Sequence, residues 1–347
     1  MTQHFAHKFS IRPVSISLRP LALLAAAASL LLLFSAAAPT AVAQTPTLIV
    51  LHAAPEKVKR GDGYRVQPPL TKDEIGDIKL NRKPVPVVSV EPLLKGPHTV
   101  QLMILFDSSQ RVGAKGQFDS IKKFIDSMPP NVEIGIGWLL QSHVKLAQTF
   151  TTDHKLLESD TLLRQQTMEE AGNSKNINGN PYSCLRDLAT HWPGGYDPTK
   201  VRAVLVFTDG LITSNAQQQS SGEQVNPDVE GTSHILQQYG VIPYPFFYQD
   251  YPLPSGHSQG GNLEGQVNFT DLVANSGGYA LFEGQFSPGS FDPLLDRLYS
   301  ELQSAVVVTV NATDKPTKQD PLDVTSKRAG YKIFGPDNVT VGNITKK

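Results

Sequence analysis

Two apolar segments of the chain each end in an acidic residue beside hydroxyl groups. The first reads LMILFDSS and ends at Ser109, and the second reads VLVFTDG and ends at Gly210. If these segments are neighbouring strands, Asp107 and Asp209 lie together at one edge of a sheet. Carboxylate and hydroxyl oxygens are the ligands that Mg²⁺ and Mn²⁺ prefer. The pattern therefore predicts a divalent-cation site.

An arginine follows the first of these segments closely. Arg111 stands two residues after Ser109, and its guanidinium stays charged and only donates hydrogen bonds. Held near Asp107 and Asp209, it would neutralise both carboxylates as a metal does, so the site would bind metal weakly or not at all. Turned into solvent, it would leave a weakened but working metal site. Both outcomes stay open from the sequence.

The elements that would position these residues alternate between strands and helices from residue 98 to 304. Continuous apolar strands such as HTVQLMILFD are typical of a sheet buried on both faces. The alternation predicts an α/β domain with a doubly wound, mostly parallel six-stranded sheet. The strand VKLAQTF follows the short polar turn 141–143, so we expect it to be antiparallel. Loops 215–231 and 249–265 are polar and follow strands, and we expect them at the ligand-binding edge.

The segments before and after this domain show strand and turn signals instead of alternating strands and helices. Residues 44–97 are rich in proline and contain the strand-like runs TLIVLH and VPVVSVEPL, and residues 305–347 show strand and turn signals without a helix. We expect two small β-rich extensions that pack together, because each has apolar strands to bury.

The first 43 residues resemble a signal peptide. Residues 1–20 are basic and lack acidic residues, residues 21–37 are apolar, and Ala43 ends a small-residue cleavage motif. This predicts cleavage before Gln44 and a periplasmic or secreted protein. A retained membrane anchor is the alternative, because the apolar run is nearly long enough to span a bilayer.

Charge and cysteine content argue against a nucleic-acid-binding protein and against a disulfide-bonded one. Net charge is −1 for the whole chain, and loss of the basic leader makes it more negative, so nucleic acid is not an expected partner. The single cysteine, Cys184, excludes an internal disulfide. Its setting in SCLRDLA predicts a buried helix residue rather than a nucleophile.

Known catalytic patterns are missing from the sequence. Phosphohydrolases of the haloacid dehalogenase type need a second aspartate two residues after the first, and Ser109 stands there. No G-x-S-x-G, H-E-x-x-H or G-x-x-x-x-G-K-[ST] pattern is present. We therefore predict that the chain is not an enzyme, with a Mg²⁺-dependent phosphohydrolase as the less favoured alternative. The aromatic run at 244–248 is predicted to be core rather than a ligand-stacking strip.

The order of these motifs resembles the von Willebrand factor A (vWA) fold over residues 98–304. In that family, Asp-x-Ser-x-Ser, a threonine loop and Thr-Asp-Gly form a metal-ion-dependent adhesion site. The resemblance implies that Asp107, Ser109 and Asp209 are metal ligands and that Arg111 replaces the second motif serine. Placing Leu185 and Asp187 on the family's Thr-x-Leu-x-Asp pattern gives one further ligand, Ser183.

Two outer segments are similar to those of exported bacterial VWFA-related proteins, known mainly from Acidobacteria. They are LTKDEIGDIKLNRKPVPVVSVEPL and VTSKRAGYKIF. The resemblance implies a non-catalytic module that binds a periplasmic or extracellular protein through the loop edge, where Ser108, Arg111 and Gly210 would make contacts. A structural scaffold without a ligand remains the alternative.

Overall fold

The computed structural model describes residues 46–56, 67–108, 115–140, 142–158, 180–212, 227–248, 260–283, 288–311 and 319–341. The chain divides into the units 1–43 and 44–347, and every described residue belongs to the second. Within these ranges no helix is long and apolar enough to cross a membrane. The predicted signal peptide lies outside the described residues.

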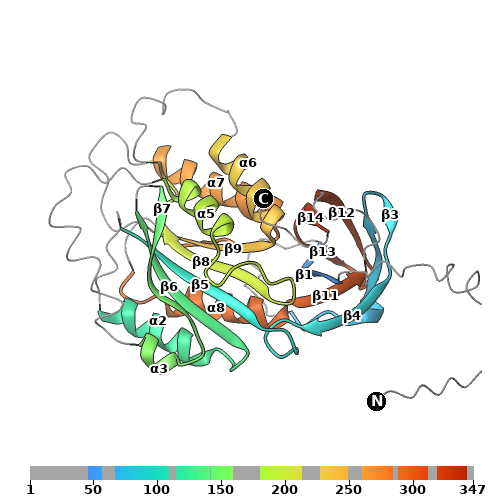
Figure 1. The fold of residues 1–347 in the computed structure, drawn as a ribbon, viewed down its shortest axis with the longest axis horizontal. Helices are drawn as coiled ribbons and strands as arrows, with labels where there is room; N and C mark the ends of the chain where they lie inside the picture. Colours follow the sequence, from blue (N-terminus) through green and yellow to red (C-terminus); the bar gives the residue numbers. More distant parts are fainter. Residues whose placement is uncertain are drawn as a thin grey trace, which may run out of the picture. The chain divides into compact units, whose positions relative to one another are not determined.

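A mixed six-stranded sheet forms the centre of the α/β part (Figure 1). Its strands, in spatial order, are β10 (Leu281–Phe282), β9 (Val241–Phe247), β8 (Val201–Thr208), β5 (Val100–Asp107), β6 (Val132–Leu140) and β7 (His143–Thr151). All neighbours are parallel except β7, which is antiparallel to β6 at the sheet edge. The predicted doubly wound α/β class and its antiparallel edge strand are confirmed.

Both faces of the central strands are buried, as their continuous apolar sequences require. Every residue of β5 and β8 is buried. Successive side chains of a strand point to opposite faces. Accordingly, Ile104 and Phe106 enter one hydrophobic core, and Met103 and Leu105 enter the other. The aromatic run at 244–248 is buried too, which confirms that it is core.

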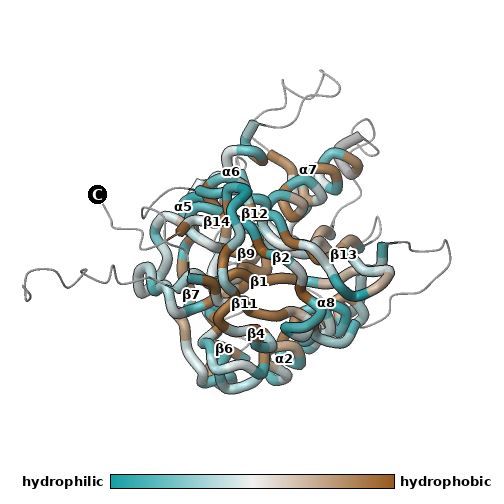
Figure 2. The backbone as a smooth tube through the Cα atoms, turned by 90° about the vertical axis from the view of Figure 1, so that its right-hand side faces the viewer, coloured by the Kyte–Doolittle hydropathy of each residue, from teal (hydrophilic) through white to brown (hydrophobic). Residues whose placement is uncertain are grey.

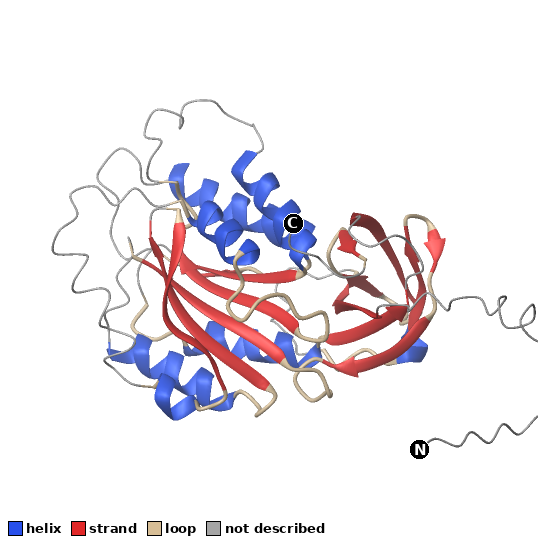
Figure 3. Cartoon of the chain, in the orientation of Figure 1, coloured by secondary structure: helices blue, strands red, loops and turns tan. Residues whose placement is uncertain are grey.

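Helices cover the two faces in separate groups (Figures 1 and 3). One group consists of α2 (Lys115–Ser127), α3 (His154–Leu157) and α8 (Asp292–Ser304). The other group consists of α5 (Pro181–Thr190), α6 (Pro227–Tyr239) and α7 (Gly260–Ser276). Helix α2 connects β5 to β6, on one side of β5, and α6 connects β8 to β9, on the opposite side of β8. The strand order therefore reverses between β5 and β8.

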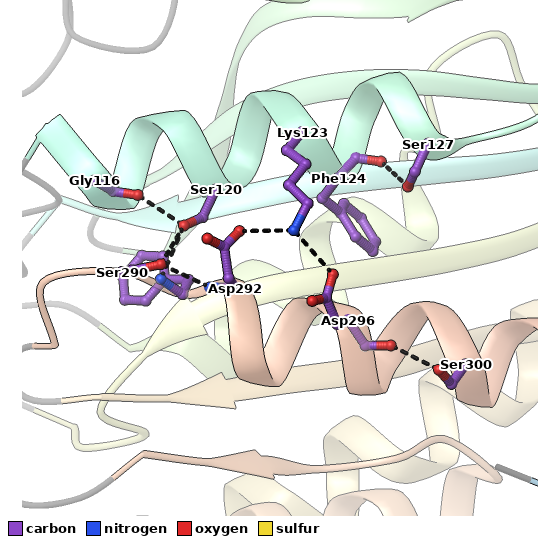
Figure 4. A network of polar contacts seen from close by, with 10 residues as sticks. Gly116, Ser120, Lys123, Phe124, Ser127, Ser290, Asp292, Asp296 and Ser300 are labelled. Atoms are coloured by element: carbon purple, nitrogen blue, oxygen red, sulfur yellow. Dashed lines mark hydrogen bonds and ion pairs between the residues drawn. The ribbon is translucent and has the colours of Figure 1, made fainter.

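Polar contacts hold α2 and α8 together on their shared face (Figure 4). The Ser120 hydroxyl lies 2.9 Å from that of Ser290 and accepts a hydrogen bond from the backbone N–H of Phe291. One turn along, Lys123 Nζ lies 3.5 Å from both Asp292 Oδ1 and Asp296 Oδ1. These exposed ion pairs fix the relative position of the helices more than they stabilise the fold.

Two helices begin earlier than the sequence indicated. Helix α6 starts at Pro227 and α7 at Gly260, so the ends of the expected loops 215–231 and 249–265 are helical. For α6, Pro227 has a backbone angle suited to the first helical position, and Asp228 and Glu230 favour the positive helix N-terminus. The rest of both loops lies outside the described residues.

The N- and C-terminal extensions form two further four-stranded sheets together. Their strands are β1 (Pro46–Pro55), β2 (Ile75–Leu80), β3 (Lys83–Pro84), β4 (Val87–Pro92), β11 (Val306–Asn311), β12 (Gln319–Ser326), β13 (Tyr331–Phe334) and β14 (Asn338–Thr340). Strand β1 pairs with β11 and β13, and β2 pairs with β12. Figure 2 shows that β1 and β11 are hydrophobic along much of their length. The predicted packing of the two extensions on each other is confirmed.

An ion pair joins segments 70–93 and 324–334 of the two extensions. Arg328 donates to both carboxylate oxygens of Glu74, at 2.8 and 2.7 Å. The same guanidinium donates to the carbonyls of Pro68 and Pro69, both at 3.1 Å. The Arg328 hydrogen bonds lower the pKa of Glu74 to about 2. Arg328 thus ties the C-terminal extension to the start of the N-terminal one.

Arg328→Lys should lower the melting temperature (Tm) measurably, because an ammonium cannot reproduce a forked contact to one carboxylate and two carbonyls. The control is Lys79→Ala, since Lys79 lies 4.0 Å from an exposed Asp323 and such pairs contribute little. Scanning calorimetry of both variants measures the two changes in Tm. Equal Tm values for the two variants would show that Arg328 does not join the extensions.

Candidate functional site

Asp107 and Asp209 stand at the ends of two neighbouring strands, where the strand order reverses. Asp107 ends β5, Asp209 follows β8, and the register pairs Phe106 with Phe207 in front of them. Both aspartates are buried, with 4% and 7% of their surfaces exposed. The two aspartates thus stand at the carboxyl ends of neighbouring strands, at one edge of the sheet.

Thr208 connects the two ends. Its hydroxyl donates to Asp107 Oδ2 at 2.6 Å and accepts from the backbone N–H of Gly210 at 3.2 Å. Asp209 Oδ1 in turn accepts from the backbone N–H of Leu211 at 3.0 Å. Thr208 belongs to the Thr-Asp-Gly motif, but the sequence did not predict it to be a site residue. The sequence signal that could have identified it is its place directly between a continuous apolar run and Asp209.

Helices α5 and α7, which cover the same face of the sheet, hold the turn at Asp209 in place. The Tyr182 hydroxyl donates to the Gly210 carbonyl at 2.8 Å, and burial raises the pKa of Tyr182. Gly210 has a φ of +70°, and a Cβ there would lie 2.8 Å from the Phe269 ring. A Cβ on Gly265 of α7 would lie 2.1 Å from the Asp209 carbonyl oxygen. The turn is thus fixed by a close approach that needs glycine on both sides.

Ser108 and Ser183 have other partners. Ser108 Oγ donates to the Leu139 carbonyl at 2.7 Å, which ties the end of β5 to β6. Ser183 Oγ accepts from Arg186 Nη2 at 2.8 Å, and this guanidinium also lies 3.1 Å from Asp228 Oδ1. Among the contacts of the described residues, the Ser183 hydroxyl is therefore bonded within α5 and not to Asp107 or Asp209. Ser109 and Arg111 lie outside the described residues.

Asp187, used to align the threonine loop, has a role at the edge strand. Its Oδ2 accepts from the backbone N–H of Val144 at 3.2 Å, and its Oδ1 lies 2.9 Å from His191 Nδ1. Asp187 therefore anchors α5 to β7.

Cys184 lies close to the acidic pair but is not poised to react. The side chain is fully buried, and its Sγ donates to the His143 carbonyl at 3.3 Å. Burial, followed by the charge of Asp107, raises the pKa of the thiol to about 12. A thiol in this state is not a nucleophile at neutral pH, and the prediction of a buried helix residue is confirmed.

The chemistry of the described donors suits a hard cation in part. Asp107, Thr208 and Asp209 supply two carboxylates and a hydroxyl at one point of the sheet edge, which is the oxygen chemistry of Mg²⁺ and Mn²⁺. Across the described ranges, no cluster of three or more His, Cys, Asp or Glu side chains could hold a metal. Any cation here would therefore depend on hydroxyl groups, with Ser109 as the nearest candidate in sequence.

No family model matches the chain, and no curated protein matches it. Among solved structures, the human COPII-coat protein Sec24c is similar with a TM-score of 0.44 and 9% identity, over 71% of this chain and 44% of that one. The SpRpn10 VWA domain is similar with a TM-score of 0.36 and 9% identity, over 57% of this chain and 95% of that one. The chain thus spans less than half the length of Sec24c. Similarities this distant assign no function, and the α/β fold stands on the strand order itself.

Proposed function

We propose that this protein is a non-catalytic vWA-type module that binds another protein through the carboxyl edge of its six-stranded sheet. The observation that carries the proposal is the position of Asp107 and Asp209 at the ends of neighbouring strands, where the strand order reverses. Ligands of doubly wound sheets bind at this position. The polar sequences that follow β5, β8 and β9 start from the same edge and would supply the contact surface, with Ser108, Arg111 and Gly210 at its centre.

The cation site at this edge is proposed to be degenerate. Arg111 replaces the second motif serine, and the Ser183 hydroxyl is engaged by Arg186. A guanidinium cannot ligate a metal, so Arg111 would compensate the charge of Asp107 and Asp209 directly. In that state the module binds its partner without Mg²⁺ or Mn²⁺. The proposed setting is periplasmic or secreted, following from the leader sequence.

A metal titration tests the role of Arg111. Wild-type Tm should respond little to millimolar Mg²⁺ or Mn²⁺, because stabilisation grows as RT ln(1 + [L]/Kd) and a weak site gives almost none. Arg111→Ser should gain a metal-dependent rise, because it restores an oxygen ligand and removes the competing charge. Lys95→Ser removes the same charge as a control, because Lys95 is an exposed residue in the turn before β5.

Each outcome of that titration has a clear meaning. A wild type that gains several degrees in Mg²⁺ would show a working metal site and would reject charge compensation by Arg111. No gain by Arg111→Ser would show that the site fails for further reasons, such as the engagement of Ser183 by Arg186.

A separate pull-down distinguishes the binding module from a scaffold without ligand. The full chain, the Arg111→Ser variant and a Gly210→Ala variant are used as bait for periplasmic proteins, with and without Mg²⁺. A partner retained by wild type and lost by Gly210→Ala supports binding at this edge. Identical partners for wild type and both variants would reject it.

A further inference from the structure

A small cavity lies at the opposite end of β8 from the acidic pair. Its volume is about 70 Å³, and its wall is formed by residues of β1, the start of β8, the ends of α6 and α7, and β14. Its cationic lining residues are Lys200 and Arg202, and no acidic residue is among the described residues that line it.

Arg202 is an unusual member of this lining. Only 4% of its surface is exposed. Within the described part of the chain, its Nε and Nη1 atoms have no hydrogen-bond partner, and it takes part in no salt bridge. Its guanidinium carbon lies 4.1 Å from the centre of the Tyr196 ring, which offsets some of the charge by a cation–π contact. Tyr196 and Asp197 also favour the charged guanidinium, yet burial outweighs both and lowers the pKa of Arg202. A buried cation with this little compensation is costly, and an arginine cannot lose its proton to avoid the cost.

Two hydroxyl groups in the same cavity wall are also buried without a hydrogen-bond partner among the described residues. Thr47 on β1 and Ser276 at the end of α7 are buried, with 7% and 2% of their surfaces exposed. Among the described residues, neither hydroxyl oxygen has a hydrogen-bond partner. Buried polar groups are normally bonded, so four unbonded donor atoms on three residues of one cavity wall call for a common acceptor.

Other polar residues of the wall are already occupied. Lys200 Nζ lies 3.0 Å from Glu133 Oε2. Gln237 donates to the Asn275 carbonyl and accepts from Asn338, at 2.6 and 3.0 Å. Of the two described cationic side chains in the wall, Arg202 is therefore the one without a salt bridge.

We propose that this cavity binds a small oxyanion, a phosphate or carboxylate group, paired with Arg202 and hydrogen-bonded by Thr47 and Ser276. Charge-assisted hydrogen bonds from a guanidinium to such an anion are short and strong. The cavity volume suits one such group or several waters. It is too small for a whole nucleotide or a peptide. The site lies between the β extensions and the α/β part, so occupancy would couple the two.

Thermal unfolding of the full chain in different sodium salts at equal ionic strength tests the proposal. The probes are inorganic phosphate and acetate, with chloride as the reference. Wild-type Tm should rise with phosphate, acetate or both, in a saturable manner and by a few degrees. Arg202→Met should abolish this rise, and in chloride it should unfold at or above the wild-type Tm because the buried charge is gone. Thr47→Val, of similar shape, should weaken the response.

Lys332→Met is the matched control, because it removes the same charge from an exposed residue of β13. It should keep the wild-type response. A response to phosphate alone identifies a phosphoryl ligand, and a response to acetate alone identifies a carboxylate. A wild type that behaves alike in all three salts would show that water fills the cavity and would overturn the proposal. An equal response in Arg202→Met would do the same by placing the anion elsewhere.

Discussion

Gly265→Ala should lower the Tm of the protein by several degrees, although alanine is the better helix former. In an exposed helix this exchange gains about 0.5–1 kcal/mol. Here the added Cβ would lie 2.1 Å from the Asp209 carbonyl oxygen and 3.1 Å from the Phe247 ring. Forcing α7 away from the turn should cost about 1–3 kcal/mol or more. Calorimetry or circular dichroism melting measures the change.

Gly231→Ala provides the matched control for this exchange. Gly231 also lies within a helix, α6, but a Cβ there would meet only Arg186 Nη1, at 3.6 Å. Its Tm should stay the same or rise. If both glycine variants gain stability, α7 does not press on the Asp209 turn as described, and the support of the acidic pair has to be assigned elsewhere.

Acidification below pH 6.5 should destabilise the wild type much more than His52→Phe. His52 is fully buried in β1, stacks on Phe334 at 5.2 Å between ring centres, and has a pKa lowered by burial to about 4. In the unfolded chain its pKa is the ordinary 6.5. Between these values the unfolded state binds a proton that the folded state does not, so stability falls as pH falls. The loss approaches about 3 kcal/mol at pH 4.

Urea unfolding at several pH values between 4 and 7.5 measures this loss. His52→Phe removes the titrating group while keeping a flat ring against Phe334, so its unfolding free energy should change less over this range. His234→Gln, at an exposed position of α6, should follow the wild type. Parallel curves for wild type and His52→Phe would mean that His52 accepts its proton within the fold.

The sequence indicates the α/β part well because its signals are local. Continuous apolar runs marked β5 and β8, and the short turn 141–143 was enough to predict the antiparallel direction of β7. Helix starts were harder: α7 begins at Gly260, inside a segment whose glycines suggest a loop. There, packing of α7 against the Asp209 turn outweighs the weak local propensity.

The site was predicted only as far as strand ends determine it. Asp107 and Asp209 stand at one edge of the sheet because β5 and β8 are neighbours, which periodicity and topology rules can anticipate. The partner of Ser183 depends on Asp228, a residue of another helix that holds Arg186 in place. The burial of Arg202 depends on β1, which is distant in sequence. Contacts of this kind arise from tertiary packing and leave no mark on local spacing.

Strand β1 opens the described chain, whereas both of its partners, β11 and β13, belong to the last part of it. During synthesis β1 therefore precedes its partners, and its apolar residues and both backbone edges stay unpaired until β11 and β13 have been made. Such long-range pairing is slow and leaves the waiting strand prone to aggregation. A chain that stops after α8 would carry β1 and β4 as open, sticky edges. Both edges of β1 can therefore be paired only in a chain that extends through β13.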